Sequence, residues 1–238
     1  MPILYLMNAT PFLEVSVLQA ALPLVDIKRR ERVMQMKDNK NRALSLAAGV
    51  LLSYAVTCYK KEKKTPFLRE VTAKELIDYL KEKEKQGTVS IPQIEMYANG
   101  KPYLKDMPDI CFNLSHSGEY VVCAISGSEI GADIQNHKRN IQEGVLKKVL
   151  HEVEKERYKD FFEAEKASLF FQIWAAKEAY SKYTGEGLSI DFRLLLTDFK
   201  EGIILDTRTG IKHNLHLISS LPGYTIAVVC KEKIDLKV

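Results

Sequence analysis

The segment Phe112–Gln135 contains three apolar runs separated by very short turns, and this pattern limits the folds open to the chain. The runs are ICFNL, EYVVCAIS and EIGADI, with glycines at 118 and 127 in the turns between them. Apolar runs of this length bounded by glycine predict consecutive β-strands. A Ser-His pair then falls at one strand end and Asp133 at another, so we expect two sides of one pocket.

Asp133 needs a partner, because an ionised carboxylate that leaves water requires a cation, a metal or several hydrogen-bond donors. The best candidate lies downstream at Glu178, in the run FFQIWAAKEAYSKYTGEGLS. Magnesium takes one or two protein carboxylates and completes its shell with waters and substrate phosphates. If the strand and the helix abut, the two carboxylates predict a magnesium site with a phosphate ester as its companion.

Lys182 lies one helical turn after Glu178, and Trp174 one turn before it, so the three share a helix face. One interpretation is a surface Glu-Lys pair, which stabilises a helix by about 0.2–0.5 kcal/mol. The other is a functional pair, favoured because Trp174 indicates partial burial and because lysine suits a phosphate as a point charge.

His116 has two interpretations as well. A lone histidine between serines and glycine commonly caps a turn, but it can also bind a phosphate oxygen. A nucleophile and base pair with Ser115 is disfavoured, because neighbouring residues on a strand point to opposite faces. Phosphate binding is therefore the preferred role.

The composition is that of a soluble globular protein: 238 residues, 46% hydrophobic and 28% charged. A net charge of +4 is too small to predict nucleic-acid binding. The positive residues cluster, however, at Lys28, Arg29, Arg30 and Arg32. Such a cluster suits a phosphate-rich ligand or an acidic protein partner, although a solvated helix face has the same pattern.

The four cysteines form no CxxC pair and lie mostly in apolar runs, which favours buried thiols in a reducing compartment over zinc or disulfides. No signal peptide is expected, since the N-terminal run lacks a basic start. The uncharged stretch between Arg42 and Lys60 is short for a membrane span and is interrupted by polar residues. We therefore expect a cytoplasmic protein without a membrane partner and with this helix in its core.

The first half predicts a strand at Ile3–Met7, a basic helix from Asp26 to about Lys37, and then the uncharged helix. The charged segment Lys60–Gln86 contains a capping box at Thr72 and Glu75, so we expect a peripheral helix there, with an apolar stripe of Leu76, Tyr79 and Leu80. A turn at Asn99 and Gly100 follows.

The second half predicts helices at about 141–150, to 160, and 164–183, the last ended by Gly185 and Gly187, and then an antiparallel meander. GEYVVCAIS in the first half is echoed by PGYTIAVVC in the second. We therefore predict an α+β fold of two similar halves, residues 1–127 and 128–238, although two unrelated strands can look equally alike.

Four segments together resemble the surfactin-synthetase-activating (Sfp-type) 4'-phosphopantetheinyl transferases: GKP at 100–102, FNLSHSG at 112–118, GADIQ at 131–135 and WAAKEAYSKYTGEGLS at 174–189. The order and rough spacing agree from about Lys28 to the C-terminus. The resemblance implies a pseudo-twofold pair of α+β halves with the active site between them. It also implies transfer of phosphopantetheine from coenzyme A to a serine of an acyl or peptidyl carrier protein, with release of 3',5'-ADP.

The resemblance implies roles for residues of the second half. Asp133, Gln135 and Glu178 would hold Mg²⁺ on the coenzyme A pyrophosphate. Glu178 would also deprotonate the carrier serine, directly or through a water. Lys182 would neutralise charge on the pyrophosphate, which suits a reaction governed by positioning and electrostatics.

Cofactor-binding residues of the resemblance lie mostly upstream. Ser115 and His116 would bind phosphate, with His116 on the 3'-phosphate, while Gly100, Lys101 and Arg42 would flank the nucleotide. Because both halves belong to one chain, a monomer is expected. The carrier could serve fatty acid biosynthesis or the biosynthesis of secondary metabolites such as polyketides and nonribosomal peptides.

Two features depart from the family pattern. Gln135 replaces the acidic residue of the usual GIDIE, so we expect weaker metal binding and a raised magnesium requirement. The charged segment Lys60–Gln86 is longer than expected and is either a decoration or a contact for the carrier.

Two alternatives to the transferase remain. One is a different magnesium-dependent phosphoryl transferase or phosphatase, for which no glycine-rich phosphate loop is present. The other is a non-catalytic coenzyme A or carrier-protein binding module with a decayed metal site. The presence of Lys177, Glu178 and Lys182 argues against the module, since pure binding needs no base.

Overall fold

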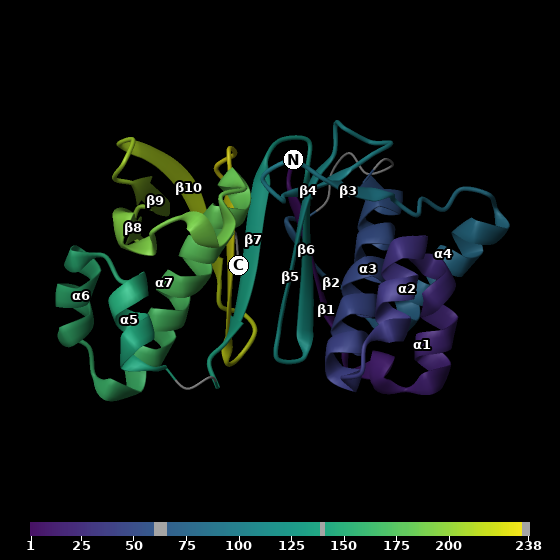
Figure 1. Ribbon diagram of the computed structural model, residues 1–238, viewed down its shortest axis with the longest axis horizontal. Helices are drawn as coiled ribbons and strands as arrows, with labels where there is room; N and C mark the ends of the chain where they lie inside the picture. Colours follow the sequence, from purple (N-terminus) through teal and green to yellow (C-terminus); the bar gives the residue numbers. More distant parts are fainter. Residues whose placement is uncertain (60–65, 139–140, 235–238) are drawn as a thin grey trace. The chain divides into compact units, whose positions relative to one another are not determined.

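The computed structural model describes residues 1–59, 66–138 and 141–234 (Figure 1). The chain divides into two compact units. The N-terminal unit comprises Met1–Tyr97 and Pro102–Ser128, and the C-terminal unit comprises Ala98–Lys101 and Glu129–Val238. Each unit combines a sheet with helices, so the predicted α+β class is confirmed.

The N-terminal unit is built on a four-stranded sheet with the strand order β2-β1-β6-β5. Its strands are β1 (Ile3–Asn8), β2 (Leu68–Glu70), β5 (Cys111–Ser117) and β6 (Tyr120–Ser126). Only the β1–β2 pair is parallel. A separate hairpin of β3 (Ile94–Met96) and β4 (Pro102–Leu104) flanks the predicted turn.

The helices of this unit form layers over the sheet, with α3 against β6 and the other helices outside α3 (Figure 1). They are η1 (Thr10–Leu13), α1 (Val15–Ala21), η2 (Leu22–Leu24), α2 (Ile27–Gln35), α3 (Asn39–Tyr59) and α4 (Ala73–Lys85). As predicted, the Asp26 side chain caps α2 by accepting a hydrogen bond from the backbone N–H of Arg29 at 3.0 Å. The capped end fixes where the basic helix begins.

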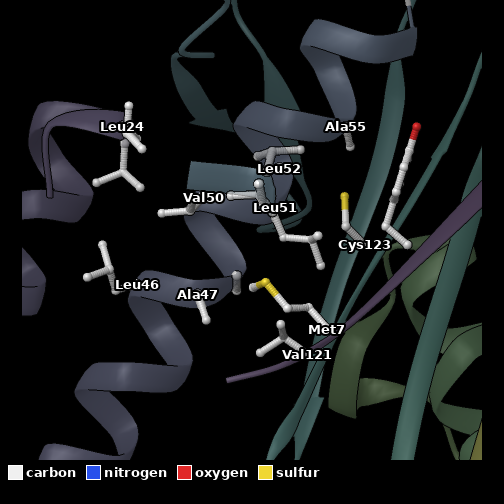
Figure 2. Packing of buried hydrophobic residues seen from close by; sticks show 14 of the residues in the cluster. Met7, Leu24, Leu46, Ala47, Val50, Leu51, Leu52, Ala55, Val121 and Cys123 are labelled. Carbon is white, nitrogen blue, oxygen red and sulfur yellow. The ribbon is translucent and has the colours of Figure 1, made fainter. Parts of the chain in front are cut away.

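Helix α3 is the central helix of this unit's core. Its small and branched residues Ala47, Leu51 and Ala55 pack against Met7, Val121 and Cys123 of the sheet (Figure 2). By length and composition α3 could cross a membrane, but 83% of its most apolar window is buried inside the protein. The uncharged stretch is therefore the core helix that its sequence predicts.

Helix α4 forms most of the described part of the charged segment, while residues 60–65, which include the KKEKK run, lie outside the described residues. The predicted capping box is confirmed, because Thr72 and Glu75 each accept a hydrogen bond from the other's backbone N–H. Leu76 and Leu80 are buried against α3 as expected, and so is Ile77, which the predicted stripe omitted. The helix thus extends the core of the N-terminal unit.

The C-terminal unit is built on a five-stranded antiparallel sheet with the strand order β7-β11-β10-β9-β8. The strands are β7 (Ile130–Asn136), β8 (Leu195–Asp198), β9 (Ile203–Asp206), β10 (Ile211–Ile218) and β11 (Tyr224–Cys230). The predicted meander is confirmed as β8 to β11. Strand β7 pairs with β11, so β5 and β7 of the Phe112–Gln135 segment belong to different sheets.

The helices of the C-terminal unit are α5 (Glu143–Val149), α6 (Glu152–Lys159), α7 (Glu163–Thr184), η3 (Gly187–Ser189) and η4 (Phe192–Leu194). The long helix α7 packs along β7 and β11 (Figure 1). It ends as predicted at Gly185, which has the left-handed φ of +77° that favours glycine.

The two echoed segments occupy the same place in their own sheets. Strand β6 lies between two antiparallel neighbours, β1 and β5, and strand β11 lies between two antiparallel neighbours, β7 and β10. A glycine with positive φ precedes each strand, Gly118 at +61° and Gly223 at +75°. The likeness of the two sequences therefore reflects two similarly placed central strands.

Candidate functional site

A close approach between α7 and β7 brings Asp133 of the strand together with Glu178 and Lys182 of the helix. It depends on Gly131, because a Cβ atom there would lie 2.1 Å from the carbonyl oxygen of Ala179 and 2.5 Å from the backbone N of Tyr183. Both contacts are with backbone atoms, which cannot rotate away. Glycine inside a strand is the sequence signal for such a close backbone approach.

Asp133 and Lys182 form an ion pair across this contact. The Lys182 Nζ atom lies 2.7 Å from Asp133 Oδ1 and also donates to the carbonyl oxygen of Ala132 at 3.2 Å. The Asp133 side chain is only 4% exposed, whereas that of Lys182 is 26% exposed. Strand and helix therefore abut, which is the condition that the predicted metal site requires, and a buried carboxylate is held by a partly accessible cation.

Gln135 also binds Asp133, its neighbour two residues away on the same face of β7. Its Nε2 atom donates to Asp133 Oδ2 at 2.6 Å. Its Oε1 atom is buried and has no hydrogen-bond partner among the residues that the structure describes. An unsatisfied carbonyl oxygen beside a carboxylate is a ready ligand for a hard cation.

Glu178 completes the cluster from α7. Burial and the neighbouring Asp133 carboxylate raise the pKa of Glu178, and these effects outweigh Lys182 and a hydrogen bond from Trp174, which lower it. The predicted shared face of Trp174, Glu178 and Lys182 is thus present. A carboxylate with a raised pKa is a better proton acceptor than an ordinary glutamate.

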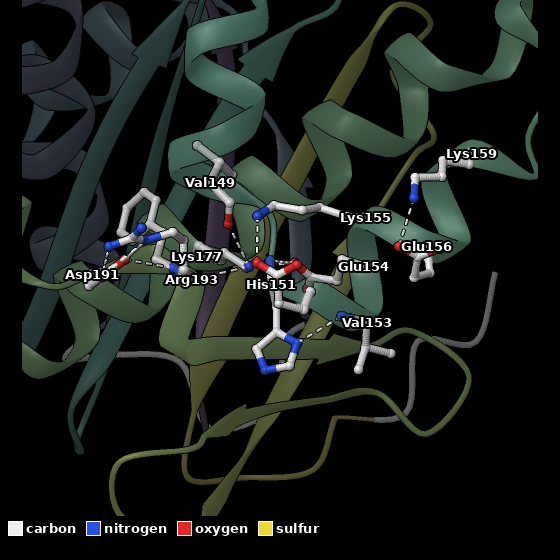
Figure 3. A network of polar contacts seen from close by, with 12 residues as sticks. Val149, His151, Val153, Glu154, Lys155, Glu156, Lys159, Lys177, Asp191 and Arg193 are labelled. Carbon is white, nitrogen blue, oxygen red and sulfur yellow. Dashed lines mark hydrogen bonds and ion pairs between the residues drawn. The ribbon is translucent and has the colours of Figure 1, made fainter.

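Lys177 lies next to Glu178 in sequence but points into the core of the C-terminal unit (Figure 3). Its Nζ atom is fully buried, pairs with Glu154 and donates to the carbonyl oxygens of Val149 and Phe192 at 2.8 and 2.9 Å. Lys177 therefore stabilises the fold. Its use as an argument for catalysis was wrong, because adjacent helix residues lie about 100° apart around the axis.

A basic cavity of about 580 Å³ lies within the N-terminal unit. Part of the predicted basic cluster lines it: Arg29 and Arg32 from α2, with Lys37 in the following turn. His116 of β5 is exposed and lines the same cavity. Asp38 is its one acidic lining residue among those described, so the cavity favours an anion.

Arg29 is held in place by a contact that the sequence analysis missed. A Cβ atom at Gly49 of α3 would lie 2.3 Å from Arg29 Cδ, so the absence of a side chain there gives room to the arginine. The Arg29 guanidinium donates to the carbonyl oxygen of Ser45 at 2.9 Å. Glycine in the middle of a buried helix was the available signal, since it lowers helix stability unless packing requires it.

Ser115 and His116 lie on opposite faces of β5, as predicted. Ser115 is 8% exposed, whereas His116 faces the basic cavity. The alternation of side chains along a strand therefore separates Ser115 from His116.

Three further predicted residues have other local roles. The Lys101 ammonium pairs with Glu129 and donates to the carbonyl oxygen of Tyr183 at 2.7 Å. Gly100 has a φ of +82° in the turn before it. Arg42 donates to Asn39 Oδ1 at 2.9 Å and does not line the basic cavity. A contact of these residues with a nucleotide remains a prediction.

The acidic cluster fits a magnesium ion of the kind that shares its shell with phosphates. Asp133 and Glu178 supply two carboxylates, and the unpartnered Gln135 Oε1 supplies a neutral oxygen. No group of three or more His, Cys, Asp and Glu side chains gathers for a metal within residues 1–59, 66–138 and 141–234. Gln135, an amide, occupies the position beside Asp133 on β7.

The C-terminal unit thus holds an acidic cluster with a paired lysine, and the N-terminal unit holds a basic cavity. Comparison with known proteins makes the class specific: residues 129–229 match the model of the 4'-phosphopantetheinyl transferase superfamily. The likeness to this superfamily therefore covers most of the C-terminal unit.

Individual relatives agree with the family match. The chain is 33% identical to 4'-phosphopantetheinyl transferase Sfp of Bacillus subtilis over 139 residues, which is 54% of this chain and 58% of the relative. It is 34% identical to the transferase gsp of Aneurinibacillus migulanus, over 55% of this chain and 57% of the relative. It is 38% identical to psf-1 of Bacillus pumilus, over 40% of each chain. The matches confirm the Sfp-type resemblance and span about half of the relatives' length or less.

Proposed function

We propose that this protein transfers the 4'-phosphopantetheine group of coenzyme A to a serine of an acyl or peptidyl carrier protein, in a magnesium-dependent reaction. The observation that carries the proposal is the cluster of Asp133, Glu178 and Lys182 formed where α7 meets β7 over Gly131. The cluster lies in the part of the chain that matches the transferase superfamily.

The chemistry is a substitution at phosphorus. The serine oxygen of the carrier forms a bond to the β-phosphorus of coenzyme A, the bond to the bridging oxygen breaks, and 3',5'-ADP leaves. Magnesium, when bound by Asp133, Glu178 and Gln135, would offset the negative charge of the pyrophosphate.

Glu178 is the proton acceptor in this proposal. Its side chain faces the same cluster as Asp133 and Lys182, which would place it beside the reacting phosphate. The serine proton passes to the Glu178 carboxylate, directly or through one water. Lys182 lies beside Asp133 with its side chain partly exposed, so it can donate to a phosphate oxygen.

The N-terminal cavity is assigned to the 3'-phosphate of coenzyme A. Arg29, Arg32 and Lys37 supply positive charge and His116 supplies a directed donor. Arginine pairs with phosphate through two parallel N–H groups, so the arginines match the anion in shape as well as charge. All the residues in this assignment belong to the N-terminal unit.

The test is the intact mass of an apo carrier protein after incubation with the protein, coenzyme A and Mg²⁺. Both an acyl carrier and a peptidyl carrier are used, because the carrier type is part of the question. We expect a gain of one phosphopantetheine that EDTA abolishes. No gain with either carrier, while coenzyme A still binds, would favour the non-catalytic binding module.

A further inference from the structure

Asp133 has both carboxylate oxygens occupied by side chains of its own unit. Lys182 Nζ lies 2.7 Å from Oδ1, and Gln135 Nε2 lies 2.6 Å from Oδ2. The Asp133 side chain is 4% exposed, so these donors replace much of the water that an exposed carboxylate would bind. The charge that a divalent cation would neutralise is thus already compensated by the protein.

The orientation of the Gln135 amide follows from its partner. A carboxylate only accepts hydrogen bonds, so the amide nitrogen must face Asp133 and the amide oxygen must face away. That oxygen is buried without a hydrogen-bond partner among the described residues. A glutamate at this position has no donor to offer, so it could not hold Asp133 in the same way.

We propose that Lys182, as a built-in counter-ion, and Gln135, as a hydrogen-bond donor, compete with the divalent cation for Asp133. The cation then binds tightly only together with the pyrophosphate of coenzyme A. The pyrophosphate attracts the Lys182 ammonium away from Asp133, and a half-turn of the Gln135 amide replaces its donor by its oxygen. This inference deepens the proposed function and rests on it.

The competition implies linkage between the two ligands. If coenzyme A releases Lys182 from Asp133, it raises the affinity for the cation, and the cation raises the affinity for coenzyme A by the same factor. Couplings of this kind are about 5- to 150-fold. In a site without an internal competitor, coenzyme A would raise the affinity for the cation only through the direct contacts between cation and phosphate.

Direct measurement of cation binding tests the proposal. Mn²⁺ is the probe, the electron paramagnetic resonance signal of free Mn²⁺ is the readout, and no carrier protein is present. For the natural sequence we expect weak binding that coenzyme A strengthens by about tenfold or more. Lys182→Met removes the competing charge and Gln135→Glu replaces the competing donor by a ligand. Each should tighten Mn²⁺ binding without coenzyme A by about tenfold and reduce the effect of coenzyme A.

A control variant separates a local effect from a change in overall charge. Gln19→Glu adds the same charge at an exposed site in the N-terminal unit and should leave Mn²⁺ binding unchanged.

Melting in EDTA gives a second readout, because Gln135→Glu places two carboxylates face to face. Its melting temperature should be lowered and should recover with Mn²⁺.

Two results would overturn the proposal in different ways. Tight Mn²⁺ binding that is independent of coenzyme A, and is the same in all variants, would refute the built-in counter-ion while leaving the proposed transferase intact. No Mn²⁺ binding in any variant, even with coenzyme A, would refute the metal site of the proposed function itself.

Discussion

Replacing Gly131 by alanine tests whether the close approach of α7 to β7 builds the site. The added Cβ would lie 2.1 Å from the Ala179 carbonyl oxygen and 2.9 Å from Tyr183 Cα, where ordinary contacts are 3.4 Å or more. Because both neighbours are backbone atoms, strand and helix must separate by about 1 Å. Lys182 directly precedes Tyr183 on the same turn, so its distance to Asp133 must change.

The size of the effect follows from this separation. Overpacking of a core costs about 1–3 kcal/mol, and we expect the upper part of that range because no side chain can move aside. For a chain of this length that loss lowers the melting temperature by about 4–12 °C. A misplacement of about 1 Å can reduce the transfer rate about 100-fold.

Scanning calorimetry and the carrier mass assay measure the two effects, and Gly144→Ala in α5 is the matched control. A Cβ atom at Gly144 has no neighbour within 4 Å, so alanine there should be neutral or stabilise the helix by up to about 1 kcal/mol. If Gly131→Ala melts and reacts like Gly144→Ala, the reasoning about the helix and strand contact is refuted.

Three further predictions concern other parts of the molecule. Lys177→Met should lower the free energy of unfolding by about 3–5 kcal/mol in urea titrations, because it leaves Glu154 buried without its partner; a loss below about 1 kcal/mol would contradict a structural role. His116→Ala should raise the KM for coenzyme A about tenfold but leave that for dephospho-coenzyme A, which lacks the 3'-phosphate, nearly unchanged; an equal effect on both substrates would argue against the assigned cavity. Arg208 lowers the pKa of Asp206 to about 2, so Asp206 stabilises the fold above the ordinary aspartate pKa, and this contribution is lost as the pH falls from about 4 to 2. The urea midpoint of Asp206→Asn should therefore fall less over that range than that of the natural sequence, and parallel curves would refute the link.

Local signals predicted much of the fold. Asp26, Thr72 and Gly185 mark helix ends by their own hydrogen-bonding and backbone preferences, which act within a few residues. The shared face of Glu178 and Lys182 followed from helical spacing alone. These features were predictable because each depends on neighbours in the chain.

Contacts between distant segments were not predictable in the same way. Helical spacing could not show that Lys177 meets Glu154, or that Lys101 meets Glu129, because each pairing depends on how separate elements pack. The same holds for Gly131, whose role appears only when α7 lies on β7. The contact of Lys182 with Asp133 likewise required the positions of strand and helix together.

The most direct test of the account compares the transfer rate of Glu178→Gln with that of the natural sequence, with coenzyme A binding measured in parallel. Glutamine keeps the size of the side chain but cannot accept the serine proton. We expect a rate about 100- to 10,000-fold lower, with coenzyme A still bound. An unchanged rate of holo-carrier formation would contradict the assignment of Glu178 as the proton acceptor and, with it, the proposed active site.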